Sequence, residues 1–170
     1  MSIQLKSTGD IHAKGLKVLV YGQAGSGKTT LTKTLPKPVV LSAEDGLLSL
    51  KDDNIPFIEI KSIGDLHEAY SWLSESDEFE SVVLDSISEI AEVVLAHEKK
   101  VNKDGRAAYG EMDVQLSEII RAFRDLNMHV LMTAKLEKQQ DELAKDRSGK
   151  LEAWETPDLG EIIKKIGGEV

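Results

Sequence analysis

The stretch that decides the fold is GQAGSGKT at residues 22–29. Its glycines, Lys28 and Thr29 match the phosphate-binding loop pattern, in which a glycine-rich turn leads from a strand into a helix. The apolar run at residues 18–21 predicts the strand, and residues 36–38, which include two prolines, end the helix. Strand, loop and helix in this order direct backbone amides and the positive end of a helix toward phosphate, so the sequence predicts a polyphosphate site.

The residue types of the loop suit this chemistry. Its glycines allow backbone angles and close approaches that side chains would block. Lys28 supplies a positive charge at the β- and γ-phosphates, with a catalytic as well as a binding role, and the Thr29 hydroxyl is offered to Mg²⁺. The alternative is a glycine-rich turn with an exposed lysine. The predicted phosphate-binding residues are Gly22, Gln23, Ala24, Gly25, Ser26, Gly27, Lys28, Thr29 and Thr30.

Strands and helices alternate along the rest of the chain. Short apolar runs predict strands, and apolar residues at helical spacing predict helices. Because the runs are continuous, the strands are expected to be covered on both faces, which is typical of parallel sheets. We therefore predict a three-layer α/β fold with a mainly parallel sheet. The predicted strands are residues 39–41, 55–60, 81–85 and 130–133, and the predicted helices cover 46–50, 66–73 (with Ser62 and Asp65 as a cap), 87–95 and 112–123.

Polar side chains follow three of these strands at their carboxyl ends, the edge where parallel sheets bind ligands. Asp85 ends an apolar strand, where a buried carboxylate needs a partner or a metal, so it is a candidate to hold Mg²⁺, with a helix cap as the alternative. Glu44 is placed to orient or deprotonate an attacking water, and Asp45 competes for that role, although a solvated turn acid would explain either. Thr133 is a candidate γ-phosphate sensor or a simple strand-end hydroxyl.

Two polar segments interrupt the alternation, and both are predicted to be loops. They cover residues 101–110, with two glycines, and residues 138–157, without clear periodicity. Long loops within compact domains are often functional.

Composition narrows the function classes. The 170 residues carry 21 Lys and Arg against 30 Asp and Glu, for a formal charge of −9. An acidic total disfavours a large basic surface, and the lack of cysteine excludes disulfides, thiolate nucleophiles and Cys-ligated zinc. With no run of about 20 apolar residues and no apolar signal core, we expect a single cytoplasmic domain without a membrane partner.

Together these segments resemble the RecA-type ATPase core. The resemblance is carried in chain order by the phosphate loop, Ala43-Glu44, VVLDS at 82–86 and the strand at 130–133. More narrowly, the chain is similar to small phage nucleotide-binding proteins of the RecA-like single-strand annealing group at residues 16–22, 44–50 and Tyr109-Gly110. The match covers residues 14–136 and implies a single RecA-like P-loop ATPase domain over 1–170. Residues 137–170 then form a polar loop and an end segment that is either naturally short or truncated relative to relatives.

The resemblance implies an ATPase that binds ATP and ADP, uses Mg²⁺, and works in the cytoplasm of a bacterial host as a phage or prophage protein. It carries over Lys28 and Thr29 for phosphate and metal, Glu44 as the catalytic acid-base residue and Asp85 as the Walker B acid, which favours Glu44 over Asp45. Ser42 departs from the pattern, because RecA proteins carry an aspartate there.

The same resemblance implies action on single-stranded DNA in recombination, annealing or repair, with a single-strand binding protein and further copies of the chain as partners. RecA-type proteins contact DNA through the loops after the Walker B helix and after the last core strand, where bases can stack on aromatic rings and cations follow phosphates. Residues 136–157 hold four basic and six acidic residues, so solvated loops are the alternative. The candidate DNA contacts are Lys103, Arg106, Tyr109, Lys138 and Arg147.

Two other functions stay open. A small-molecule phosphotransferase of this size usually needs an arginine-rich lid, and this chain has four arginines without a cluster in its latter half. A nucleotide-dependent loader or assembly factor would instead use ATP to switch its affinity for a protein partner.

Overall fold

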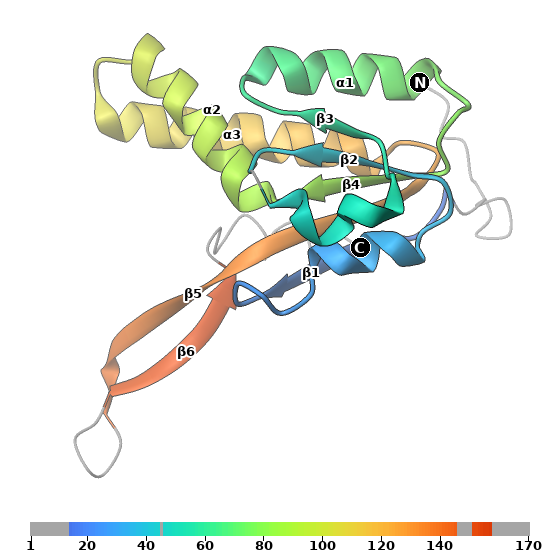
Figure 1. Cartoon of the computed structure of the whole chain (residues 1–170). Coiled ribbons are helices and arrows are strands. Elements are labelled where there is room, and N and C mark those ends of the chain that lie inside the picture. Colours follow the sequence, from blue (N-terminus) through green and yellow to red (C-terminus); the bar gives the residue numbers. More distant parts are fainter. Residues whose placement is uncertain (1–13, 45, 146–150, 158–170) are drawn as a thin grey trace, which may run out of the picture.

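The computed structural model describes residues 14–44, 46–145 and 151–157. A sheet with covering helices makes up most of this part of the chain (Figure 1). Every predicted strand and helix has a counterpart in it. The elements are β1 (Lys17–Gly22), the 3₁₀ helix η2 (Thr29–Thr34), β2 (Pro38–Ser42), the 3₁₀ helix η3 (Leu47–Asp53), β3 (Phe57–Glu59), α1 (Ile63–Glu75), β4 (Ser81–Asp85), α2 (Ile87–Val101), α3 (Gly105–Arg124), β5 (His129–Lys145) and β6 (Leu151–Pro157).

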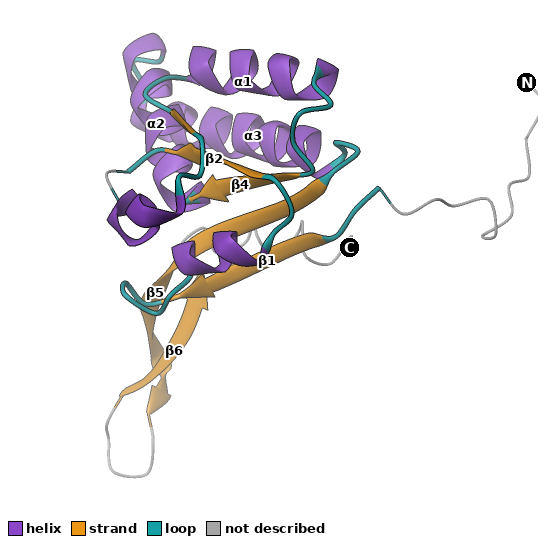
Figure 2. Ribbon diagram, turned by 45° about the vertical axis from the view of Figure 1, so that its right-hand side comes forward, coloured by secondary structure: helices purple, strands orange, loops and turns teal. Residues whose placement is uncertain are grey.

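The sheet has the strand order β1-β5-β4-β2-β3, and all neighbours along this path are parallel. Strand β6 lies off the path and pairs antiparallel with β5. Helices α1, α2 and α3 cover one face of the sheet, and the short helices η2 and η3 cover the other (Figure 2). The predicted three-layer α/β fold with a mainly parallel sheet is therefore confirmed.

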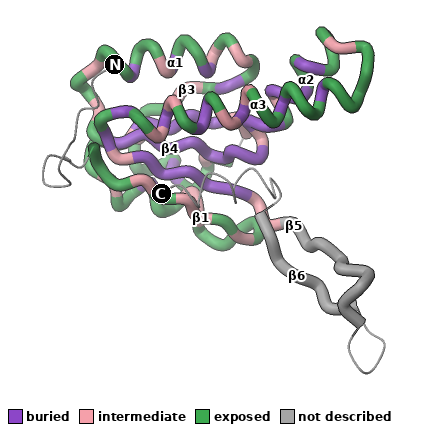
Figure 3. The backbone as a smooth tube through the Cα atoms, turned by 180° about the vertical axis from the view of Figure 1, so that it is seen from behind, coloured by how far each residue is buried: buried purple, intermediate pink, exposed green. Residues whose placement is uncertain are grey.

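The core is divided unequally between the two faces. A large cluster packs the sheet against the three α-helices, and it includes the fully buried side chains of Leu41, Leu84, Ile90, Leu116 and Phe123. A small cluster of Val40, Leu50, Val83 and Leu131 holds η3 on the other face. The central strands are buried on both sides (Figure 3), which explains the continuous apolar run of β4. Most of the apolar stabilisation thus comes from the α-helical face.

Helix α1 begins at the predicted cap. The Asp65 backbone N–H donates to Ser62 Oγ at 3.2 Å, and the Ser62 N–H donates to the Asp65 carboxylate at 2.8 Å. A further bond from the Lys61 backbone N–H is the main cause that lowers the pKa of Asp65 below its ordinary value. This reciprocal capping box fixes the start of the helix, whose apolar side chains Leu66 and Leu73 are buried.

The prediction of a loop over residues 101–110 is wrong. Helix α2 continues through Val101, and α3 already begins at Gly105, so the connection is three residues long. Asp104 caps α3 by accepting the Arg106 N–H at 3.0 Å, and Ala108 is fully buried one turn later. The two glycines are accommodated in the first turns of the helix, because the packing of Ala108 and the residues after it outweighs their low helix propensity.

The prediction of a loop over residues 138–157 is also wrong for residues 138–145 and 151–157, which form strands, whereas residues 146–150 lie outside the described part of the chain. Strand β5 continues to Lys145 and pairs with β6 from Leu136↔Pro157 to Gln140↔Ala153, with a register shift before Lys145. The resulting hairpin extends away from the helix-covered body (Figure 1). Because none of the helices in the described part of the chain lies over this hairpin, its strands do not need the apolar runs that identify the core strands, and the register shift interrupts any simple alternation.

Smaller differences concern the ends of elements. The strand predicted over residues 55–60 is β3, with three residues, and the helix predicted over 46–50 is η3. In the part of the chain that the structure describes, no helix has the length and apolar character needed to cross a membrane.

Candidate active site

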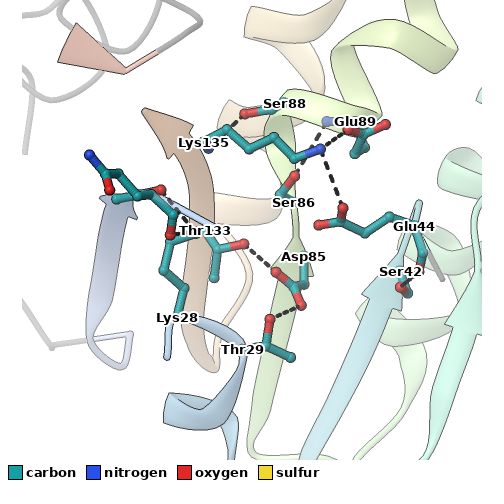
Figure 4. Close-up of polar contacts among 12 residues, drawn as sticks. Lys28, Thr29, Ser42, Glu44, Asp85, Ser86, Ser88, Glu89, Thr133 and Lys135 are labelled. Carbon is teal, nitrogen blue, oxygen red and sulfur yellow. Dashed lines mark hydrogen bonds and ion pairs between the residues drawn. The ribbon is translucent and has the colours of Figure 1, made fainter. Parts of the chain in front are cut away.

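The parallel register brings the predicted site residues to one edge of the sheet. Strand β5 lies between β1 and β4, and Thr133 of β5 is in register with Val20 of β1. At the same edge, Ser42 at the end of β2 is in register with Asp85 at the end of β4. The phosphate loop follows β1 at the same edge. Figure 4 shows Lys28, Thr29, Asp85, Thr133 and Glu44 in this region, carried by four different strands or the segments that follow them.

The loop itself has the backbone that its glycines predict. Gly25 and Gly27 have φ angles of +76° and +87°, in the left-handed region that other residues rarely adopt. No atom lies within 4 Å of a Cβ built on either residue, so conformation rather than crowding requires glycine here. The helix after the loop differs from the usual long helix, because η2 is a six-residue 3₁₀ helix that ends before Pro36. Electrostatic attraction at this loop therefore depends more on Lys28 and the loop amides than on a helix dipole.

Lys28 lies folded back against its own loop. Its Nζ donates to the carbonyl oxygens of Gly22 at 2.8 Å and Gln23 at 3.0 Å. Both carbonyl oxygens are neutral acceptors for the Lys28 ammonium. A phosphate would replace neutral acceptors with a charged one, which makes a shorter and stronger hydrogen bond.

Asp85 is the most enclosed charged group of the site, with 2% of its surface exposed. Thr29 Oγ1 donates to Asp85 Oδ2 at 2.7 Å, and Thr133 Oγ1 donates to Asp85 Oδ1 at 2.5 Å. Both carboxylate oxygens thus have a hydroxyl partner, which reduces the cost of burying the carboxylate. The reading of Asp85 as a helix cap is wrong, because Ser86 caps α2 by accepting the Glu89 N–H at 3.4 Å.

Glu44 lies past the end of β2, about one third exposed, and faces a lysine that the sequence analysis missed. Lys135 Nζ is 3.3 Å from the Glu44 carboxylate and also donates to the carboxylate of Glu89, on the first turn of α2. The hydrogen bond from Lys135 to Glu89 is the main cause that raises the pKa of Lys135. Asp45 lies outside the described residues.

Two features of the sequence place Lys135 and Glu89 at this edge of the sheet, without indicating that they pair. Lys135 follows Thr133 by two positions, and a strand directs such side chains to the same face. Glu89 is the acidic residue of the first turn of α2, directly after the Asp85 strand. The departure at Ser42 has a structural role, because its hydroxyl donates to the Glu44 carbonyl at 2.7 Å and holds the backbone that carries Glu44.

The four candidate DNA contacts within the described residues lie in two separate segments. Lys103 is in the turn between α2 and α3, and Arg106 and Tyr109 are in the first turns of α3. Lys99 Nζ lies 5.3 Å from the centre of the Tyr109 ring. Lys138 is in β5, where it begins to pair with β6, and Arg147 lies outside the described residues. The tip of α2 and α3 and the β5-β6 hairpin both project from the end of the molecule that carries the phosphate loop (Figures 1 and 2).

A strand, a glycine-rich phosphate loop and a helix, with an enclosed acid at the end of a nearby parallel strand, define a P-loop nucleoside triphosphatase. The chain belongs to the AAA domain family, whose model matches residues 14–166. It is accordingly an ATP-binding ATPase of the P-loop class. The chain is also similar to the crystal structure of a KaiC-like protein from the hyperthermophilic archaeon Pyrococcus horikoshii, at 15% identity and a TM-score of 0.45, over 84% of each chain. A search of the curated proteins finds no match.

Proposed function

We propose that the protein hydrolyses Mg·ATP to ADP and phosphate. Lys28 would bind the phosphates, Thr29 and Asp85 would hold the metal, and Glu44 would act as the general base. The observation that carries the proposal is the 2.7 Å hydrogen bond between Thr29 and Asp85, which connects the phosphate loop to the acid of β4. A hydroxyl and a carboxylate in contact at the mouth of a phosphate loop are the hard oxygen donors that Mg²⁺ prefers.

The residues present fit both ATP and its metal. The left-handed glycines free the loop amides for phosphate oxygens, and Lys28 can exchange its two carbonyl partners for the β- and γ-phosphates. Thr29 and Asp85 would hold Mg²⁺, which when bound neutralises charge on the phosphates. The Thr133 hydroxyl donates to the Asp85 carboxylate, so it would move when metal and γ-phosphate bind beside that carboxylate. This contact supports the sensor role proposed for Thr133.

Glu44 is proposed as the general base. It would accept a proton from water as the water oxygen bonds to the γ-phosphorus and the bond from that phosphorus to the bridging oxygen breaks, with ADP as the leaving group. Its partial exposure leaves room for water, and Ser42 holds its backbone. We expect Glu44→Gln to keep nucleotide binding and lower turnover about 100-fold or more.

We further propose that the ATPase acts on single-stranded DNA in phage-type recombination, annealing or repair, in the cytoplasm of a bacterial host. The sequence resemblance supports this role, and so does the tip of α2 and α3, which carries Lys103, Arg106 and the half-exposed Tyr109, with Lys99 Nζ 5.3 Å from the centre of the Tyr109 ring. Further copies of the chain and a single-strand binding protein are the partners we propose.

One observation favours a nucleotide-dependent assembly factor as the second candidate function. The side chain of Val101, the last residue of α2 and therefore at the same tip, is 65% exposed. Apolar side chains beside cations suit a protein partner as well as a nucleic acid.

The test is an ATPase assay with and without single-stranded oligonucleotides, using Glu44→Gln as the catalytic variant. Glu59→Gln is the matched control, because Glu59 is also a strand-end glutamate but pairs with Lys61. Stimulation of the wild type by DNA supports the DNA role. ATP-dependent capture of a protein without DNA would favour the assembly factor, and full turnover by Glu44→Gln would remove Glu44 from the mechanism.

A further inference from the structure

One cation lies between two carboxylates at the edge of the site. Lys135 in β5 contacts Glu44, after β2, and Glu89, in α2, so three separate elements meet at one ammonium group (Figure 4). The contact with Glu89 is the closer of the two, and the contact with Glu44 is 3.3 Å.

We propose that Lys135 is a positioning residue for Glu44, and that Glu89 is the counter-ion that prevents Lys135 from neutralising it. The inference rests on the proposed function, since it assigns Glu44 the role of general base. Lys135 holds the Glu44 carboxylate in place, while the stronger partnership with Glu89 leaves that carboxylate able to accept a proton.

The backbone is held in place at each of the three residues Lys135, Glu44 and Glu89, which we call the trio. The Lys135 backbone N–H donates to Ser88 Oγ at 2.9 Å, and its Cα is in register with Gly22 at the start of the phosphate loop. Glu89 is in the capped first turn of α2, and Ser42 holds the Glu44 carbonyl. Only the side-chain torsions of the trio remain to be set, and the two ion pairs set them.

The charge balance explains why two carboxylates share one cation. An isolated ion pair between Lys135 and Glu44 would lower the basicity of Glu44, because the ammonium favours the ionised carboxylate. With Glu89 present, one ammonium and two carboxylates leave the trio with a net negative charge. Glu44 is then oriented by the cation without being fully paired to it.

This arrangement predicts that loss of Lys135 and loss of the Glu89 charge both lower turnover, although they change the surroundings of Glu44 in opposite ways. Removing Lys135 releases Glu44 from its position. Removing the charge of Glu89 transfers Lys135 wholly to Glu44, which then becomes a weaker base. Removing both leaves Glu44 free but unpaired, so the double variant is expected to be no slower than Lys135→Met alone.

The experiment compares Lys135→Met, Lys135→Arg, Glu89→Gln and the double variant Lys135→Met/Glu89→Gln. All three positions of the trio are at least 31% exposed at the side chain, so the variants are expected to fold, and thermal melting checks this. We expect kcat to fall about 10- to 100-fold in Lys135→Met and in Glu89→Gln, with Mg·ADP affinity by calorimetry changed less than about threefold. Lys135→Arg should restore most of the turnover.

A second readout uses the nucleotide-free protein. The hydrogen-bonded ammonium of Lys135 should give a slowly exchanging ¹H–¹⁵N lysine resonance, assigned by its loss in Lys135→Met. It should survive in Glu44→Gln, shift in Glu89→Gln and disappear in Glu44→Gln/Glu89→Gln. If the wild type does not hydrolyse ATP, the proposed function fails, and this resonance alone decides whether the trio exists.

Three results would overturn the inference. The first is a double variant whose loss of kcat equals the product of the losses in Lys135→Met and Glu89→Gln, because the two residues would then act independently. The second is a loss of nucleotide affinity in the single variants as large as their loss of kcat. The third is a Lys135 resonance that does not change in Glu89→Gln.

Discussion

Thr29 and Asp85 are 56 positions apart in the chain, and a 2.7 Å hydrogen bond joins them. The bond connects the first residue of η2 to the last residue of β4. One is a helix and the other a strand, so no backbone pairing holds these two elements together. Its formation depends on β5, which separates β1 from β4 and contributes Thr133 to the other oxygen of the same carboxylate. The sheet order thus brings Thr29, Asp85 and Thr133 together from positions far apart in the sequence.

Replacement of Lys28 by alanine is expected to weaken Mg·ATP binding roughly 100-fold. Loss of a charge-assisted contact to phosphate costs about 3 kcal/mol, which corresponds to that factor in affinity. Calorimetry with Mg·ADP and a non-hydrolysable ATP analogue measures this. Lys33→Ala is the control, because Lys33 lies in the same short helix but pairs with Asp53. Unchanged affinity of Lys28→Ala would exclude Lys28 from the site.

Asp85→Asn is expected to abolish Mg²⁺-dependent nucleotide binding while leaving the stability of the fold almost unchanged. The asparagine removes a buried charge and keeps an oxygen acceptor for Thr29 or Thr133, so the unfolding free energy should stay within about 1 kcal/mol of the wild type. Mg²⁺-dependent nucleotide binding should nevertheless be lost. Asp85→Ala leaves the buried Thr133 hydroxyl without its best acceptor and should cost about 2 kcal/mol. Urea unfolding and calorimetry compare the three proteins, and equal Mg²⁺ dependence in Asp85→Asn would contradict the metal role.

The capping box of α1 predicts a pH-dependent contribution to stability. The folded state lowers the pKa of Asp65 below its ordinary value of 3.8, chiefly through the Lys61 backbone N–H. The contribution is therefore fully present above the ordinary pKa and is lost as the pH falls through the lower folded value. Asp65→Ala should be less stable than the wild type by about 1 kcal/mol at neutral pH, and the gap should narrow below about pH 4. Urea unfolding across this range is the measurement, and a gap that stays constant with pH would show that the cap does not depend on charge.

The DNA proposal predicts salt-sensitive binding that depends on the tip of α2 and α3. Removing one phosphate-contacting cation lowers the slope of log affinity against log salt by about 0.7 for a single strand. We therefore expect the double variant Lys103→Gln/Arg106→Gln to reduce the slope by about 1.4. Lys37→Gln, which removes an exposed cation paired with Glu80, is the control. An oligonucleotide affinity that does not respond to salt would argue against a phosphate-binding tip.

The sequence was informative wherever apolar burial or backbone geometry leaves a local pattern. The glycines of the phosphate loop, the continuous apolar run of β4 and the Ser62–Asp65 cap each predict a structure within a few residues of themselves. The contacts of Lys135 could not be predicted in this way, because they join β5, α2 and the end of β2. The β5-β6 hairpin was missed because its strands lack the continuous apolar run that identifies a core strand.

Strand β5 has a consequence for how this protein can tolerate insertions and deletions. It carries Thr133 and Lys135 on one face, then continues directly into the hairpin at Leu136. A single inserted or deleted residue before Lys135 would reverse the face of every following side chain and turn the ammonium away from Glu44. Length variation among related chains is therefore expected after Leu136, where the hairpin can lengthen or shorten without disturbing the spacing that the site requires.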